Sequence, residues 1–186
     1  MNSPYNILIA GIGGQGVITL TRTITTLLEN SGQQAISSII KGGAQRLGTV
    51  HSVIRIFQNQ TDYKRFSPQI PRGSLDLLIA LEPWEALRHS SLFSRSTKIV
   101  VNSVKQPFLS DRLNGTSNTD PCEELRRLEL SSIIKDFESL SHHKHGTKKM
   151  TNFELGLESV KLGYLPFSEN NYQKYFQECL HKKDHK

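Results

Sequence analysis

Short apolar runs alternate with amphipathic stretches along the chain, and this alternation predicts a layered α/β fold. Strands are expected where apolar residues are continuous or recur at every second position. They are predicted at about 5–10, 34–40, 49–57, 75–81 and 98–102, with a weaker candidate at 125–130. The runs 75–81 and 99–101 are almost wholly apolar, which is typical of central strands covered by helices on both faces.

Helices are predicted between these strands at about 14–30, 83–91 and 132–143. Two further amphipathic segments fall at about 150–182, and their aromatic positions are assigned to packing because helical spacing alone explains them. The order of elements predicts a three-layer αβα domain with an open, mostly parallel sheet. No helix separates 34–40 from 49–57, so at least one strand pair is expected to be antiparallel. A hairpin turn at 59–61 and a surface loop at 110–121 are also expected.

Composition narrows the class of protein. At 186 residues, without a break in composition, residues 1–186 are expected to form a single domain, with the helices at 150–182 as part of it. No apolar run approaches the roughly 18 residues of a membrane span, so no membrane association is expected. The first residues lead directly into a strand without a signal-like segment, which predicts a cytoplasmic protein.

A glycine-rich loop carries the strongest chemical signal. The predicted strand 5–10 runs into Gly11-Ile-Gly13-Gly14-Gln15-Gly16, which opens the helix predicted at 14–30. Glycines at 11, 13 and 16 match G-x-G-x-x-G, a spacing that permits a tight turn and close approach of the backbone to a phosphate. A tight turn packed on the sheet is the alternative explanation of the glycines, and the strand and helix on either side favour the phosphate site. For Gln15, a ligand contact and a role in capping the loop both stay open.

The end of the second predicted strand argues against plain NAD. A dinucleotide fold places an acid there to hold the ribose hydroxyls, and this chain has Lys41-Gly42-Gly43 instead. A ligand with an additional phosphate is compatible with a lysine at this position. NADP is therefore one candidate ligand.

The net charge of +6 is concentrated in one region. Six basic residues and a single acid fall between Lys41 and Arg72, close in sequence to the strand ends that would flank the loop. A phosphorylated small molecule or an acidic protein surface explains this charge, and the absence of an aromatic-rich binding motif argues against nucleic acid. Arg55 is a candidate cation, although it could equally bridge carboxylates.

Other reactive residues are assigned structural roles. Cys122 and Cys179 form no C-x-x-C, so neither a cluster nor a zinc site is expected. Glu82 before Pro83 is read as an ordinary helix start rather than as a general base, and Glu85 likewise. The histidines at 142, 143 and 145 match no standard metal-ligand spacing.

Together with the glycine loop, the segment Lys41-Gly-Gly-Ala-Gln-Arg-Leu-Gly48 resembles the gamma subunit or domain of 2-oxoacid:ferredoxin oxidoreductases. The resemblance covers about residues 5–168, and the Glu82-Pro-Trp-Glu-Ala-Leu-Arg88 segment is most similar to the small beta subunit of indolepyruvate ferredoxin oxidoreductase. Lys41 replaces the usual histidine and Leu47 the usual glycine, which puts the substrate preference in doubt.

The resemblance implies a noncatalytic small subunit of a complex that oxidatively decarboxylates a 2-oxoacid to an acyl-CoA. Thiamine diphosphate, magnesium and iron–sulfur clusters are then expected in a larger partner subunit that passes electrons to ferredoxin, and pairing of two copies of this chain stays open. No tightly bound cofactor is expected in this chain; coenzyme A is a candidate ligand, and direct contact between it and this chain stays open. A stand-alone NADP- or CoA-binding protein is the alternative. The expected binding residues are Gly11, Gly13, Gly14, Gln15, Gly16, Lys41, Gly42, Gln45 and Arg46.

Overall fold

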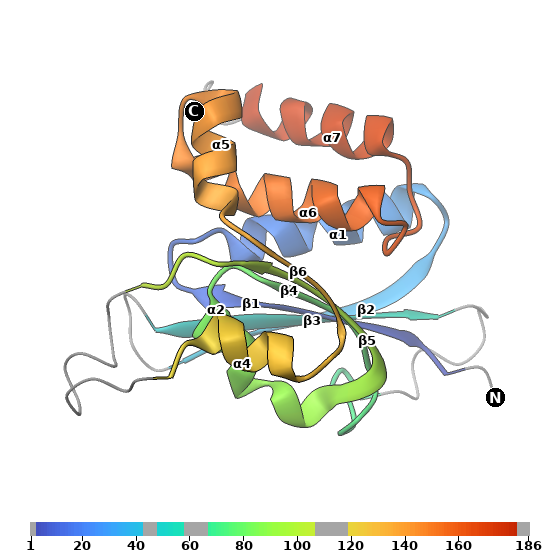
Figure 1. The fold of residues 1–186 in the computed structure, drawn as a ribbon. Coiled ribbons are helices and arrows are strands. Elements are labelled where there is room, and N and C mark those ends of the chain that lie inside the picture. Colours follow the sequence, from blue (N-terminus) through green and yellow to red (C-terminus); the bar gives the residue numbers. More distant parts are fainter. Residues whose placement is uncertain (1–2, 43–47, 58–66, 107–118, 182–186) are drawn as a thin grey trace.

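A computed structural model describes residues 3–42, 48–57, 67–106 and 119–181 of the chain (Figure 1). Within these residues, no helix has both the length and the apolar character needed to cross a bilayer. The turn predicted at 59–61, most of the loop predicted at 110–121, and Gln45, Arg46 and Leu47 lie outside the described residues.

Six strands form one mixed sheet in the order β2-β3-β1-β4-β5-β6. Their bounds are β1 Tyr5–Ile12, β2 Gln34–Lys41, β3 Thr49–Phe57, β4 Leu75–Ala80, β5 Phe93–Asn102 and β6 Ser131–Lys135. The β1–β4, β4–β5 and β5–β6 pairs are parallel, whereas β3 runs antiparallel to both β1 and β2. The prediction of a mostly parallel sheet with an antiparallel neighbour is confirmed.

Helices cover both faces of the sheet (Figure 1). On one face lie α1 (Val17–Asn30) and α6 (Thr151–Lys161), with α5 (Phe137–His145) and α7 (Glu169–His181) packed outside α6. On the other face lie α2 (Pro83–Arg88) and α4 (Pro121–Arg127). The 3₁₀ turns η2 (Ser90–Leu92) and η3 (Lys148–Met150) precede β5 and α6. This is the predicted three-layer αβα arrangement.

Apolar side chains form one cluster on each face of the sheet. Along β1, Ile7 and Ile9 join the cluster under α1 and α6, while Leu8 and Ala10 join the cluster under α2 and α4. All four are essentially inaccessible to solvent. Because successive strand side chains point to opposite faces, an uninterrupted apolar run is what a strand buried on both sides requires.

Two predicted elements were wrong, and helix caps explain both. The segment 125–130 was expected to be a strand, but its first half is the end of α4, because the Asp120 carboxylate accepts the Cys122 N–H at 2.9 Å and Pro121 opens the helix. The helix expected at 132–143 is β6 followed by α5. There the Asp136 carboxylate accepts the Ser139 N–H at 2.8 Å, so the helix begins at Phe137.

Candidate functional site

The glycine loop lies at the point where the connections of the sheet diverge. From β1 the chain passes through α1 toward β2 at one edge, whereas from β4 it passes through α2, on the opposite face, to β5. In open α/β sheets, ligands bind outside the carboxyl ends of the strands at such a point. The loop follows the carboxyl end of β1, so the fold places it where ligand sites gather.

Left-handed backbone gives the loop its shape. Gly14 has φ of 99° and Gly16 has φ of 93°, a backbone region that residues other than glycine rarely adopt. The Gln15 N–H donates to the Ile12 carbonyl at 3.1 Å and closes the turn, and α1 starts directly after Gly16. The tight turn predicted from the glycine spacing is therefore present.

Close packing explains two of the glycines, while a third faces open space. A Cβ on Gly11 would lie 2.9 Å from Gln15 Oε1 and 3.1 Å from Leu81 Cβ. A Cβ on Gly16 would lie 2.5 Å from Nδ2 of Asn152, the second residue of α6. Around Gly14 no atom of the described residues lies within 4 Å of the corresponding position, so this part of the chain leaves the crest of the loop open.

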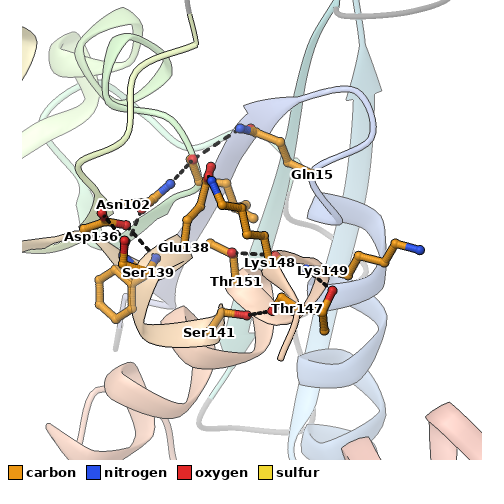
Figure 2. A network of polar contacts seen from close by, with 12 residues as sticks. Gln15, Asn102, Asp136, Glu138, Ser139, Ser141, Thr147, Lys148, Lys149 and Thr151 are labelled. Atoms are coloured by element: carbon orange, nitrogen blue, oxygen red, sulfur yellow. Dashed lines mark hydrogen bonds and ion pairs between the residues drawn. The ribbon is translucent and has the colours of Figure 1, made fainter. Parts of the chain in front are cut away.

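Carboxamide side chains fix the loop to its neighbouring strands (Figure 2). Gln15 Oε1 accepts the Ile12 N–H at 2.8 Å, and Gln15 Nε2 donates to the Leu81 carbonyl at 3.4 Å. The buried Asn102 also donates to the Leu81 carbonyl, at 3.3 Å, and its oxygen accepts the Phe137 N–H at 3.0 Å. The ends of β1, β4 and β5 and the start of α5 are thus held together. These bonds support the loop-capping role of Gln15.

Within the described residues, no side chain caps the amino terminus of α1. Its N-cap is Gly16, which offers no side chain to the first-turn N–H groups, and the first turn contains no acidic residue. Unpaired N–H groups and the helix dipole together favour a negative charge at this position. The open crest at Gly14 leaves this end of the helix accessible.

Two hollows flank the loop and share Gly14, Gly16 and Thr19. The larger, about 570 Å³, is called the η3 hollow, and the smaller, about 380 Å³, is called the β2 hollow. The η3 hollow is lined by Gly14, Gln15, Gly16, Thr19, Leu81, Asn102, Gln106, Glu138, Lys148, Lys149, Met150, Thr151, Asn152 and Phe176. The β2 hollow is lined by Ile12, Gly13, Gly14, Gly16, Val17, Ile18, Thr19, Lys41, Gly42, Gly48 and Val50.

Most of the predicted binding residues within the described chain meet around these hollows. Gly13, Lys41 and Gly42 line the β2 hollow, because the Gly13 N–H donates to the Gly48 carbonyl at 2.9 Å and β2 ends beside β3. Gln15 lines the η3 hollow, and the two remaining loop glycines at 14 and 16 line both. Gly11 lies beneath the loop as a packing residue.

Arg55 is not near this site, which corrects its candidacy as a phosphate-binding cation. It pairs in register with Asn6 at the opposite end of β1, six residues from Thr49, or about 20 Å along a strand. Its side chain is buried, with Nε donating to Asn6 Oδ1 at 2.8 Å and Nη1 donating to the Ser67 and Gln69 carbonyls at 2.5 and 3.1 Å. Arg55 therefore holds the segment after residue 66 against the sheet.

Glu82 and Glu85 have structural roles, as the sequence predicts. Glu82 is the N-cap of α2 and accepts the Glu85 N–H at 2.9 Å, while Glu85 accepts from Arg88 Nε at 3.0 Å. Burial raises the pKa of both carboxyl groups.

Within the described residues, no three or more histidine, cysteine or acidic side chains gather to hold a metal ion. His145 instead lies 2.7 Å from the buried carboxylate of Glu154, which also pairs with Lys144 at 2.8 Å.

Sequence reasoning missed the far wall of the η3 hollow. Lys148 and Lys149 come from η3 and Glu138 from α5, more than a hundred residues after the loop. The Lys148 ammonium lies 3.2 Å from the Glu138 carboxylate (Figure 2). In the sequence, the signal for this wall is the pair of basic residues at 148–149, directly ahead of Met150. Asn152, which donates to the Gly16 carbonyl at 3.3 Å, brings η3 to the loop.

Comparison with protein families adds a separate line of evidence. Residues 6–186 match the family described as pyruvate ferredoxin/flavodoxin oxidoreductase. The chain is 35% identical over 100 residues to an indolepyruvate oxidoreductase subunit IorB of Archaeoglobus fulgidus, covering 54% of this chain and 47% of that protein. It is 36% identical over 105 residues to the same subunit of Methanothermobacter thermautotrophicus, covering 56% and 50%. The matched regions thus span about half the length of these curated relatives.

Solved structures share the fold at low sequence identity. Pyruvate oxidoreductase subunit PORC of Thermotoga maritima aligns with a TM-score of 0.66 at 13% identity, over 96% of this chain and 86% of that one. A chain of 2-oxoglutarate:ferredoxin oxidoreductase from Magnetococcus marinus, with 2-oxoglutarate, coenzyme A and succinyl-CoA bound, aligns with a TM-score of 0.67 at 14% identity. That alignment covers 98% of this chain and 28% of the longer one.

Proposed function

The chain belongs to the pyruvate ferredoxin/flavodoxin oxidoreductase family, and from this premise we propose that it is the small subunit of a 2-oxoacid:ferredoxin oxidoreductase complex. The observation that carries the proposal is the family match over residues 6–186, together with relatives that are themselves subunits of indolepyruvate oxidoreductase. We assign an indolepyruvate-like 2-oxoacid as the substrate of the complex and the cytoplasm as its location.

The catalytic cofactors are assigned to a larger partner subunit. Thiamine diphosphate with magnesium supplies the decarboxylation chemistry there, and iron–sulfur clusters pass the electrons to ferredoxin. A four-cysteine cluster needs more thiolates than the two cysteines of this chain. The role of this chain is then to complete the assembly and to bind coenzyme A, which accepts the acyl group. Pairing of two copies of the chain remains a prediction.

The glycine loop supports a role in binding coenzyme A. Coenzyme A carries a diphosphate and a 3′-phosphate, which require backbone N–H donors and fixed cations. The uncapped start of α1 offers the donors, and lysines line the hollows on either side of it. The carboxamide bonds of Gln15 and Asn102 hold the loop in one geometry, so little ordering is needed when a ligand binds.

The inserted strand β3 argues against the alternative of an NADP enzyme. In a dinucleotide fold the second strand lies beside the first and brings its end to the ribose. Here Lys41 pairs with Val50 of β3, which in turn pairs with Gly11, so Lys41 is two strand spacings, about 10 Å, from β1. Lys41 is therefore farther from the loop than the ribose-binding position of such a fold.

Purification of the tagged chain from its native cells tests the assembly. We expect a larger subunit to copurify, with thiamine diphosphate and iron–sulfur absorption in the pooled complex. Elution of the chain alone, or turnover of a 2-oxoacid by the isolated chain, would contradict the proposal. A thermal-shift series at matched ligand concentrations tests the ligand, because binding to the folded state raises stability by mass action. Coenzyme A should stabilise the complex more than NAD or NADPH, and the reverse order would favour the NADP alternative.

A further inference from the structure

The two hollows offer alternative positions for the nucleotide end of coenzyme A. We propose that this end lies in the η3 hollow and that Lys149 contacts its 3′-phosphate, so that Lys149 determines preference for coenzyme A over its dephosphorylated form. The proposal rests on the coenzyme A role assigned above. The alternative position, in the β2 hollow beside Lys41, is the one that the sequence alone indicated.

Position in the sheet favours the η3 hollow. It is lined by the loop after β1, by Leu81 directly after β4 and by Asn102 at the end of β5, which are the carboxyl ends of three parallel neighbours. The β2 hollow lies instead on the antiparallel side, beside Val50 near the start of β3. Ligands of open α/β sheets bind outside the carboxyl ends at the switch point. That point lies between β1 and β4.

Size and lining also favour the η3 hollow. Both hollows fall within the range of roughly 300 to 1,000 Å³ that is typical of small-molecule sites, but the η3 hollow, at about 570 Å³ against about 380 Å³, leaves more room for a nucleotide. Leu81, Met150 and Phe176 give it apolar surface for a base, alongside the lysines and carboxamides that suit a phosphorylated ribose. This combination fits a nucleotide better than a free inorganic anion.

The charges of the η3 hollow leave one lysine uncompensated. Its charged lining residues are Lys148, Lys149 and Glu138. The Lys148 ammonium is 3.2 Å from the Glu138 carboxylate, so these two charges largely balance. No carboxylate of the described residues pairs with Lys149, and Figure 2 shows its side chain extending away from the Lys148–Glu138 pair. Among the described residues that line this hollow, Lys149 is therefore the cation available to a phosphate.

The backbone that carries Lys149 is held firmly. Its N–H donates to the Thr147 hydroxyl at 3.2 Å, and the Thr147 carbonyl accepts from the buried Ser141 hydroxyl at 2.6 Å. The Thr151 hydroxyl donates to the Lys148 carbonyl at 2.7 Å. These bonds anchor η3 to α5 and α6, so the reach of the lysine is set by its own side chain alone.

The test compares three lysine-to-glutamine variants in the assembled complex. Lys149→Gln removes the proposed contact, Lys41→Gln removes the cation of the alternative hollow, and Lys174→Gln removes an exposed charge on α7 as a control. Calorimetry gives the dissociation constants of coenzyme A and 3′-dephospho-coenzyme A for each. In Lys149→Gln the preference for coenzyme A should fall about three- to tenfold, since the pair is partly exposed, whereas Lys41→Gln and Lys174→Gln should keep it.

An unchanged preference in Lys149→Gln, or a loss confined to Lys41→Gln, would overturn the inference. Absence of coenzyme A binding by the unaltered complex would defeat the proposed function instead. In that case, binding of adenosine 3′,5′-bisphosphate to the full chain tests whether the η3 hollow is a nucleotide-phosphate site, independently of the proposed function. Weaker binding in Lys149→Gln would keep it as a nucleotide-phosphate site, and equal or absent binding would remove it. Because Lys149 is exposed, matching thermal unfolding curves should show that the variant is folded.

Discussion

Alanine substitutions at Gly14 and Gly16 separate backbone strain from packing in the glycine loop. Both residues have left-handed backbone, with φ of 99° and 93°, so a side chain at either costs about 1 to 2 kcal/mol. They differ in their surroundings. A Cβ at Gly14 would have none of the described residues within 4 Å, whereas a Cβ at Gly16 would lie 2.5 Å from Nδ2 and 2.9 Å from Cγ of Asn152.

The clash with Asn152 sets the size of the difference. Asn152 is only 4% exposed, donates to the Gly16 carbonyl at 3.3 Å and accepts the Phe153 N–H at 2.9 Å, so it has little room to move. Overpacking of this kind costs roughly 1 to 3 kcal/mol beyond the backbone strain. We therefore expect Gly14→Ala to lower the free energy of unfolding by about 1 to 2 kcal/mol and Gly16→Ala by about 2 to 5 kcal/mol.

Urea denaturation of the two variants measures this difference. Asn152→Ala combined with Gly16→Ala should recover the packing part of the loss, so the two substitutions should be non-additive in a double-mutant cycle. Equal destabilisation by Gly14→Ala and Gly16→Ala would refute the reasoning, as would additive effects of Gly16→Ala and Asn152→Ala. Either result would mean that α6 is not fitted to the loop through Asn152.

Three further predictions concern other parts of the molecule. Gly156→Ala should destabilise the protein by about 1 to 3 kcal/mol in chemical denaturation, because the added methyl would collide with the buried Tyr172 hydroxyl; unchanged stability would contradict this packing. Burial lowers the pKa of His89 from 6.5 to about 4. Between these two pH values the unfolded chain binds more protons than the folded chain, so the free energy of unfolding should fall as the pH drops from 6.5 toward 4. His89→Gln should flatten that pH dependence, and an identical slope in the variant would refute the assignment. Arg55→Met should lower the free energy of unfolding by about 2 to 4 kcal/mol by removing the hydrogen bonds to the buried Asn6 and to the Ser67 and Gln69 carbonyls, with coenzyme A affinity unchanged in calorimetry; weaker coenzyme A binding in a folded variant would return Arg55 to the site.

Most of the sheet could be predicted because its strands are short apolar runs between clear breaks. The region 125–143 could not, because its apolar residues fit a strand and a helix equally well over a few positions. The decisive signals there were Asp120 before Pro121 and Asp136 before Phe137, since a carboxylate at the N-cap fixes where a helix begins. These two caps mark where α4 and α5 begin, and β6 lies between the two helices.

The candidate site could be predicted only as far as local sequence reaches. The loop from Gly11 to Gly16 is a local structure, so its spacing was informative. Lys149 lines the hollow beside the loop because α6 packs against the loop through Asn152, and no property of residues 148–149 alone indicates that arrangement. Arg55 failed for the opposite reason. It is close to Lys41 in sequence, but β3 carries it to the far end of the sheet.

The insertion of β3 between β1 and β2 determines the order in which the chain can assemble. Strands β2 and β3 pair as sequence neighbours, but β1 pairs with β3 and β4, and its Asn6 bonds to partners 49 and 70 residues away. Folding is slow when long loops must close, because the loss of chain entropy comes before the stabilising contacts form. As the chain leaves the ribosome, residues up to Phe57 can already form the β1–β3–β2 half of the sheet with α1 across one face. The β1–β4 boundary, where the loop becomes a site, closes only after Ala80 has been made.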